Sequence, residues 1–198
     1  PAEEDQGGFK DMSTASNLER ILKAGIFAVT SECGPPRGTD PEAVKKKGGF
    51  LSGYVDAVNV TDNQTSVVRM SSFSASLILK TMGFDPVMQM VCRDRNRIAI
   101  QSDILGAAAW GINNILCLSG DHQKFGDHPT AKNVFDIDSI QLIQCVKKMV
   151  DEGRFLSGEE IKGRPSLFIG CAENPFADPF EIRAMRLAKK AKAGAQFV

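Results

Sequence analysis

The chain has 198 residues, and its 24 lysines and arginines are balanced by 24 aspartates and glutamates, so the formal net charge is zero. This balance disfavours nucleic acid and anionic membrane as partners, because both are bound through an excess of basic side chains. Hydrophobic residues make up 42% of the chain, as in a globular domain, and no apolar run approaches the roughly 20 residues of a membrane span.

Five cysteines without a Cys-x-x-Cys pair do not form a disulfide framework. The sequence shows no secretory leader, which would be a charged stretch followed by an apolar one. We therefore expect a reduced, cytoplasmic protein. The chain starts at Pro1 rather than at methionine and ends in an apolar run, and we expect both ends to be cut or processed.

The first predicted segment is a polar, aperiodic N-terminal arm over residues 1–16. A short helix follows over residues 18–23, with Asn17 as its N-cap and Gly25 as its end. From there a pattern repeats: a short apolar run, a loop rich in polar residues, and an amphipathic helix.

The apolar runs predict buried strands at residues 26–30, 55–60, 86–91, 114–118 and 167–170, and a sixth run begins at residue 195. A helix is expected after each of the five: one opened by Pro41, one to about Met82, one that ends at Gly111, one over residues 139–152 and one over residues 179–193.

Alternating strands and helices predict an α/β fold with a parallel sheet, either an open doubly wound sheet or a (β/α)8 TIM barrel. The barrel is favoured because polar residues follow almost every strand and because no Gly-x-Gly-x-x-Gly fingerprint is present. A full barrel takes about 250 residues. We therefore predict one barrel domain over residues 17–198, incomplete, with about five βα units plus a sixth strand and without its C-terminal strands.

Glu32 is a candidate acid because it follows the first predicted strand, beside Cys33 and the stiff Pro35–Pro36 pair. A carboxyl group held there would be partly desolvated, which suits it to donate a proton near neutral pH. The alternative is a solvated glutamate paired with Arg37.

Gly120 and Asp121 follow the fourth predicted strand. A glycine lets a ligand approach the backbone, and the aspartate can hydrogen-bond a polar ring or change the charge balance of a cofactor. The alternative is an ordinary turn closed by the aspartate side chain.

The sequence offers three weaker signals. Asp62 and Asp94 are interpreted as helix caps, and a phosphate site or a solvated face is expected of a basic cluster, Arg93, Arg95 and Arg97. No metal site is expected, because the spacing of His122 and His128 matches no known ligand pattern. Four cysteines near strand ends could form a redox cluster, but small apolar fillers of the barrel top are favoured: Cys33, Cys92, Cys117 and Cys171.

Five stretches in register resemble the methylenetetrahydrofolate reductase family: residues 27–38 (FAVTSECGPPRG), 59–62 (NVTD), 92–96 (CRDRN), 116–121 (LCLSGD) and 169–175. The likeness covers residues 17–198 in order. The Arg-Asp-Arg-Asn form is similar to the bacterial branch found in acetogens and in fusions with homocysteine methyltransferase.

The resemblance implies a flavin-bearing barrel of one-carbon metabolism and methionine biosynthesis that reduces 5,10-methylenetetrahydrofolate to 5-methyltetrahydrofolate. It assigns Glu32 as the acid that protonates a folate nitrogen so that the five-membered ring opens, after which reduced flavin delivers hydride. It places Asp121 near the flavin ring and the pterin.

The resemblance also implies flavin contacts after the second to fifth strands: Thr61, Gln89, Leu118, Ser119, Gly120, Asp121, Ala172, Asn174, Asp178, Lys189 and Lys190. Gln89 stands where many relatives have histidine, Asn174 where some have tyrosine, and Ser119 where others have arginine. These departures leave FAD, the first choice, and FMN both open. The electron donor is NADH, NADPH, ferredoxin or a partner subunit, and an oligomer is expected.

Two other functions stay open from the sequence. One is a pterin-binding methyltransferase barrel, which needs no flavin and no acid, so the motif around Glu32 argues against it. The other is a non-catalytic subunit or fragment that binds a partner chain, because an incomplete barrel leaves two sheet edges exposed.

Overall fold

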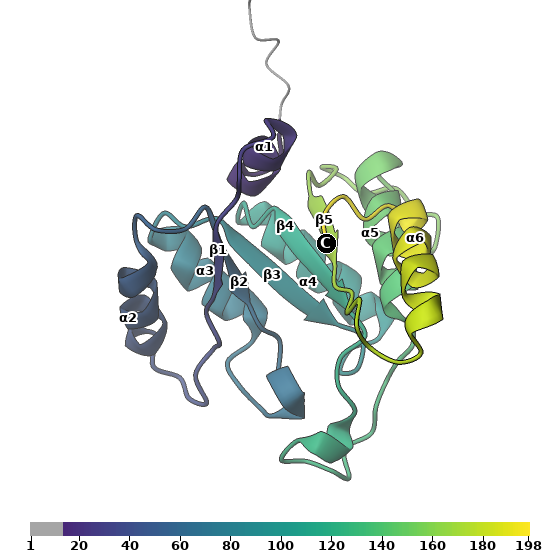
Figure 1. Cartoon of the computed structure of the whole chain (residues 1–198), viewed down its shortest axis with the longest axis horizontal. Helices are drawn as coiled ribbons and strands as arrows, with labels where there is room; N and C mark the ends of the chain where they lie inside the picture. Colours follow the sequence, from purple (N-terminus) through teal and green to yellow (C-terminus); the bar gives the residue numbers. More distant parts are fainter. Residues whose placement is uncertain (1–13) are drawn as a thin grey trace, which may run out of the picture.

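The computed structural model describes residues 14–198 (Figure 1). Most of the predicted arm, as far as residue 13, lies outside the described residues. The α-helices, strands and short 3-10 helices follow in the order α1 (Asn17–Lys23), β1 (Thr30–Glu32), α2 (Glu42–Leu51), β2 (Ala57–Val60), η1 (Gln64–Ser66), α3 (Ser72–Thr81), β3 (Pro86–Val91), α4 (Arg97–Ala109), β4 (Asn114–Leu118), η2 (Gln123–Phe125), α5 (Ser139–Asp151), β5 (Phe168–Cys171), η3 (Phe180–Ile182) and α6 (Arg183–Ala193).

The five strands form one parallel sheet in the order β1-β2-β3-β4-β5. Each strand lies beside its predecessor, as in a (β/α)8 barrel, whereas a doubly wound sheet reverses direction at a switch point. Over the described residues the sheet is open, with β1 and β5 at its edges. The fold is therefore α/β with the topology of an incomplete barrel, as predicted. Phe197 makes a parallel bridge to Gly170, where the sixth run was predicted.

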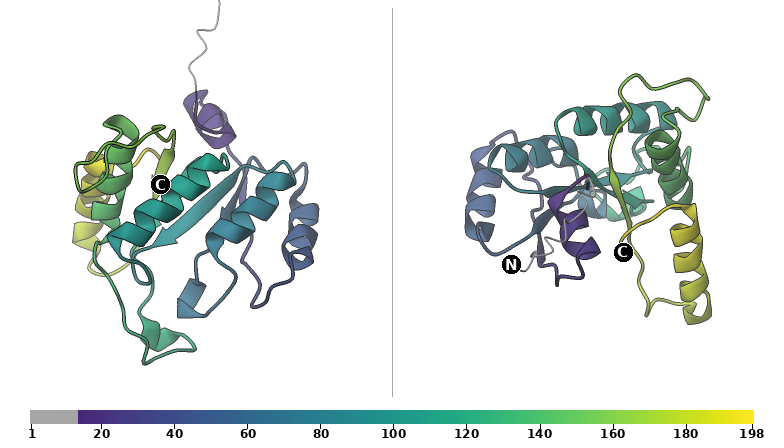
Figure 2. Two further views of the ribbon diagram at one scale, coloured as in Figure 1. Left: turned by 180° about the vertical axis from the view of Figure 1, so that it is seen from behind. Right: turned by 90° about the horizontal axis from the view of Figure 1, so that it is seen from above.

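The two faces of the sheet bury different residues, because successive side chains of a strand point to opposite sides. One face carries Val58, Met88, Ile115 and Ile169, which belong to the apolar clusters shared with the surrounding helices. Helices α2 to α6 lie in an arc on this side, with α3 and α4 in front of the sheet when it is seen from behind (Figure 2). The opposite, concave face is the one toward the viewer in Figure 1.

Helix α1 covers the amino-terminal end of the concave face. Leu18 packs in a cluster with Ala57, Val87 and Phe168, the concave-side residues of three strands. The backbone N–H of Leu18 also donates to Asp85 Oδ2 at 2.9 Å, and Asp85 directly precedes β3. These contacts hold α1 at the end of the sheet opposite the polar loops that follow the strands.

The ends of several elements differ from the prediction. Strand β1 begins at Thr30 rather than at residue 26, because pairing with β2 starts only at Ala57, and the N–H of Val29 donates to the Asp56 carboxylate at 2.8 Å. Helix α1 is capped by Ser16, whose hydroxyl accepts a hydrogen bond from the Glu19 N–H, and not by Asn17. No helix in residues 14–198 combines the length and the apolar character needed to cross a membrane.

The helices after β2 and β5 start later than predicted. After β2, three residues of the connecting loop have positive φ and interrupt the helical path before α3: Asn63, Thr65 and Ser66. After β5, Pro179 is extended (ψ 128°), and the 3-10 helix η3 precedes α6.

Candidate active site

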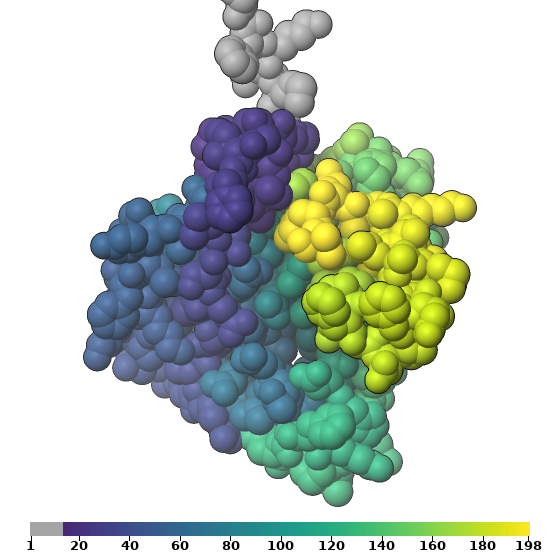
Figure 3. Space-filling model, in the orientation of Figure 1, coloured from purple at the N-terminus to yellow at the C-terminus, as the bar shows by residue number. Residues whose placement is uncertain are grey.

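A cavity of about 310 Å³ lies at the carboxyl ends of β1 to β4. Ligand pockets start at roughly this size, about 300 Å³. Figure 3 shows the concave face of the molecule in the orientation of Figure 1. This face is hollowed between the side that carries α1 and β1 and the side that carries α6. The cavity is lined by Glu32, Thr61, Asp62, Asn63, Gln64, Gln89, Val91, Arg93, Leu118, Ser119, Gly120 and Asp121.

Seven of the predicted site residues line this one cavity: Glu32, Thr61, Gln89, Leu118, Ser119, Gly120 and Asp121. They come together because the carboxyl ends of parallel strands meet at one edge of the sheet, and because alternation along each strand sends every second side chain to the concave face. The sequence did not identify Gln64 or Val91 as site residues; Val91 is the last residue of β3, two places after Gln89 and on the same side of the sheet.

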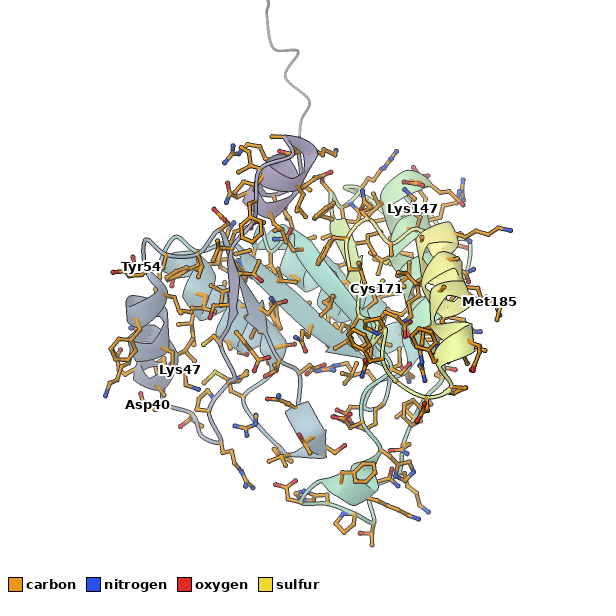
Figure 4. The ribbon with its side chains drawn as sticks, in the orientation of Figure 1. Asp40, Lys47, Tyr54, Lys147, Cys171 and Met185 are labelled. Carbon is orange, nitrogen blue, oxygen red and sulfur yellow. The ribbon has the colours of Figure 1, made fainter. Side chains whose placement is uncertain are left out.

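Glu32 lies at the wall of the cavity, but its side chain is exposed. The structure of residues 14–198 therefore does not show the partial desolvation that the sequence predicted for this carboxyl group. Among the described residues, β1 has a neighbouring strand, β2, on one side only. Nor does Arg37 pair with Glu32: Arg37 Nη2 lies 2.6 Å from Asp127 Oδ2, in the loop after β4. The loop after β1 is held instead by Lys47 of α2 (Figure 4), whose Nζ donates to the Gly34 carbonyl at 2.6 Å.

Thr61 is a buried residue with an unpartnered polar atom. It is 3% exposed, and its Oγ1 has no hydrogen-bond partner in residues 14–198. Leaving a buried hydroxyl unpaired costs about 1–3 kcal/mol, so such a group calls for a partner. Thr61 is also one of the residues that line the cavity.

Gly120 and Asp121 bring the loop after β4 against the end of β3. Gly120 has φ +92°, and a Cβ there would lie 3.1 Å from Val91 Cβ and 3.2 Å from Arg93 Cβ, so only glycine fits without strain. Asp121 Oδ2 accepts a hydrogen bond from the Thr65 N–H at 3.1 Å. The aspartate thus bonds to the neighbouring loop after β2 and does not close a turn of its own.

The arginines that follow β3 do not form a free phosphate site, because each is paired with a carboxylate. The pairs are Arg93 with Asp94, Arg95 with Asp62 and Arg97 with Asp136, each with a shortest N–O distance of 2.7 Å.

Asp62 and Asp94, predicted as helix caps, are ion-pair partners instead; α4 is capped by Asn96. The side chain of Asp62 is fully buried (0% exposed), and its Oδ2 also accepts the Val91 N–H at 3.1 Å. Asp62 therefore joins the ends of β2 and β3 beneath the cavity.

The predicted flavin contacts after β5 lie outside this cavity. Ala172 lines a second cavity of about 440 Å³, which also contacts Thr30, Asn59, Val87 and Leu116 and so lies further toward the amino ends of the same strands. Three others are exposed and line neither cavity: Asn174, Asp178 and Lys189.

Lys190 is buried, and its charge is already matched. Its Nζ donates to the Ala172 carbonyl and to Glu173 Oε2, the latter at 2.9 Å. The hydrogen bond from Lys190 lowers the pKa of Glu173, so this ion pair persists at neutral pH. Lys190 therefore reaches the end of β5, as a strand-end contact should, but it is engaged there by Glu173.

All five cysteines are free and buried, and they belong to the apolar clusters that the sheet shares with the surrounding helices. Burial raises the pKa of Cys92 to about 12 and that of Cys145 to about 11, so both are neutral thiols. This is the behaviour predicted for small apolar fillers. Within residues 14–198, no three histidine, cysteine or acidic side chains converge as metal ligands.

A family model described as methylenetetrahydrofolate reductase matches residues 17–198, a range that includes every helix and strand of the structure. No curated protein sequence matches the chain.

Proposed function

The chain belongs to the methylenetetrahydrofolate reductase family, and on that premise we propose that it reduces 5,10-methylenetetrahydrofolate to 5-methyltetrahydrofolate with a bound flavin. The family consists of TIM-barrel oxidoreductases that act on folate in one-carbon metabolism. One observation carries the proposal: the two candidate catalytic residues, Glu32 and Asp121, line the same cavity at the carboxyl ends of the strands. In a (β/α)8 barrel this is the end that carries the active site.

Three groups at the cavity support a bound flavin. Thr61 Oγ1 is a buried group in need of a partner, Gln89 offers an amide on the concave face, and Gly120 exposes its backbone beside Leu118 and Ser119. These residues would hold the flavin, with FAD as the first choice and FMN as the alternative. When bound, the flavin supplies the hydride that reduces the methylene carbon.

Glu32 is assigned as the general acid. Its carboxyl group lies at the cavity wall, where it can donate a proton to the folate nitrogen, so that the carbon–nitrogen bond of the five-membered ring breaks and the methylene carbon accepts hydride. Substrate bound in the cavity would cover this carboxyl group and bring it within reach of the nitrogen that it protonates.

Asp121 is assigned as the second polar group, facing the flavin ring and the pterin. The hydrogen bond from the Thr65 N–H restrains its carboxylate at the cavity wall. A restrained carboxylate can accept hydrogen bonds from a ring N–H of the ligand without first being reoriented, which is how preorganised polar groups favour a reaction.

The remaining residues implied by the resemblance belong to the same proposal. Ala172, Asn174, Asp178, Lys189 and Lys190 lie at the end of β5, in the loop that follows and on α6, and are assigned to the part of the flavin outside the cavity; Lys190 would then exchange Glu173 for a flavin phosphate. We further propose that the protein is a cytoplasmic oligomer. Its electrons would come from NADH, NADPH, ferredoxin or a partner subunit.

The test separates the two half-reactions. Glu32→Gln removes the proton but keeps the shape, so flavin reduction by the electron donor should proceed at nearly the wild-type rate. Reoxidation by methylenetetrahydrofolate should slow by about 10²- to 10⁴-fold, the usual worth of a general acid. Glu42→Gln, on the exposed surface of α2, is the matched control and should change neither.

Two outcomes would refute the assignments. Equal loss of both half-reactions in Glu32→Gln would remove the acid role. A colourless protein that neither FAD nor FMN reconstitutes would remove the flavin, and methyl transfer from methyltetrahydrofolate to a corrinoid or thiol would then favour the methyltransferase alternative.

A further inference from the structure

Arg93 is a buried arginine at the cavity that has no part in the reaction proposed above. It is 3% exposed and lies two residues after the end of β3. Its guanidinium donates all five of its N–H groups, to Asp94 Oδ1 and Oδ2 (2.7 Å each), Ser66 Oγ (2.8 Å), the Asp121 carbonyl (3.0 Å) and the Asn63 carbonyl (3.2 Å).

These acceptors come from three different loops. Asn63 and Ser66 follow β2, Asp94 follows β3, and Asp121 follows β4. Figure 1 shows the loops after β2 and β4 side by side below the sheet, where η1 and η2 lie. One guanidinium, placed between them, therefore fixes the relative positions of three loops at the cavity.

The loop after β2 also holds Asp121 directly. The Thr65 N–H donates to Asp121 Oδ2 at 3.1 Å, and Ser66 Oγ donates to the Asp121 carbonyl at 3.0 Å. To reach these positions, Asn63, Thr65 and Ser66 adopt φ of 42°, 57° and 58°. Such conformations are unfavourable for residues other than glycine, and they persist only when surrounding contacts impose them. Arg93 makes two of those contacts.

We infer that Arg93 is a positioning residue for Asp121, acting by locking the left-handed loop of residues 63–66 that carries the Thr65 N–H to the Asp121 carboxylate. The inference rests on the function proposed for Asp121. This positioning role requires an arginine, because the planar guanidinium reaches Asp94, Ser66 and two backbone carbonyls at once. A lysine ammonium is a single point charge with three donors.

The first experiment follows hydrogen exchange rather than activity. Arg93→Lys keeps the charge and loses the fork, so the amides of residues 63–68 should exchange about tenfold faster or more, since local protection reports the free energy of local opening. Arg97→Lys is the matched control: Arg97 makes a similar two-point pair with Asp136, away from the cavity, and its substitution should leave this segment unchanged. Unchanged exchange in Arg93→Lys would overturn the inference.

The second experiment is a double-mutant cycle on the reoxidation of flavin by methylenetetrahydrofolate. Misplacing a reacting group by about 1 Å can cost about 10²-fold, so Arg93→Lys should slow this step by about 10- to 100-fold. In an Asp121→Asn background the same substitution should have little further effect, because residues that act as a unit are not additive. Multiplicative losses would mean that Arg93 does not act through Asp121.

Ser66→Ala keeps the test decisive if Arg93→Lys does not fold. This smaller change removes the hydroxyl that joins Arg93 Nη1 to the Asp121 carbonyl. It should give the same faster exchange and the same lack of additivity with Asp121→Asn. The absence of both effects would overturn the inference. A wild-type protein that binds no flavin and does not turn over folate would refute the proposed function, whereas the exchange result depends only on the loop.

Discussion

Replacing Asp62 by alanine should destabilise the protein more than any other change to the ion pairs beside the cavity. The Asp62 side chain is fully buried and accepts three hydrogen bonds: from Arg95 Nη1 at 2.7 Å, from Arg95 Nη2 at 3.3 Å and from the Val91 N–H at 3.1 Å. Asp62→Ala leaves the Val91 N–H buried without an acceptor and leaves Arg95, which is 17% exposed, without its buried partner.

The magnitude follows from what Arg95 keeps. Removing one partner of a buried pair costs about 3–5 kcal/mol. The lower end applies, because Arg95 Nε retains Asp103 at 3.0 Å, on the exposed side. At about 2–4 °C per kcal/mol for a chain of this size, a loss of about 3 kcal/mol lowers the melting temperature by about 6–12 °C.

Calorimetry and urea unfolding measure this loss, and two variants calibrate it. Asp103→Ala removes the exposed partner of the same arginine (40% exposed) and should cost at most about 1 kcal/mol. Asp62→Asn keeps an acceptor for the Val91 N–H but loses the charge, so its cost should lie between the two. If Asp62→Ala shifts the melting temperature no more than Asp103→Ala does, the argument from burial is wrong.

Three further predictions concern stability. Burial raises the pKa of Cys92 to about 12 and that of Cys145 to about 11, against about 8.5 in an unfolded chain. As pH rises, these thiols therefore ionise first in the unfolded chain. The free energy of unfolding, measured with urea, should fall from about pH 9 toward pH 11. A constant value would contradict this. Gly170→Ala places a methyl group against the Phe197 ring and should cost about 1–3 kcal/mol by overpacking, whereas an unchanged urea midpoint would show that the ring moves freely. Asp138→Ala removes the capping box of α5 and should cost about 1 kcal/mol; Asp138→Asn, which still accepts the cap hydrogen bond, is the comparison and should cost less.

The sequence predicted the fold well where local pattern and tertiary environment agree. Strands β3 and β4 match the predicted ranges residue for residue, because continuous apolar runs mark strands that are buried on both faces. The first run failed for the opposite reason. Residues 26–29 are apolar, but no strand pairs with them, and Phe27 is exposed. Composition alone does not distinguish a paired residue from its unpaired neighbour.

Much of the cavity lining could also be predicted, since a polar residue at the end of a parallel strand can only lie at one edge of the sheet. What could not be predicted depends on neighbours that are distant in sequence. In the described residues, the exposure of Glu32 goes together with a β1 that has only β2 beside it, and the pairing of Lys190 with Glu173 depends on where α6 lies relative to the end of β5. The role of Arg93 depends on backbone conformations in the loop after β2, which no residue type there demands.

Helix α1 has a consequence for the passage of ligands. Leu18 and Leu22 contribute to the wall of the second cavity, where α1 packs on the amino-terminal end of the concave face. The first cavity, at the carboxyl ends of the strands, lies at the other end of the concave face, beside the loops that follow the strands. A polypeptide that packs on the loops after the strands would therefore cover the first cavity, whereas additions beside α1 lie at the opposite end of the strands.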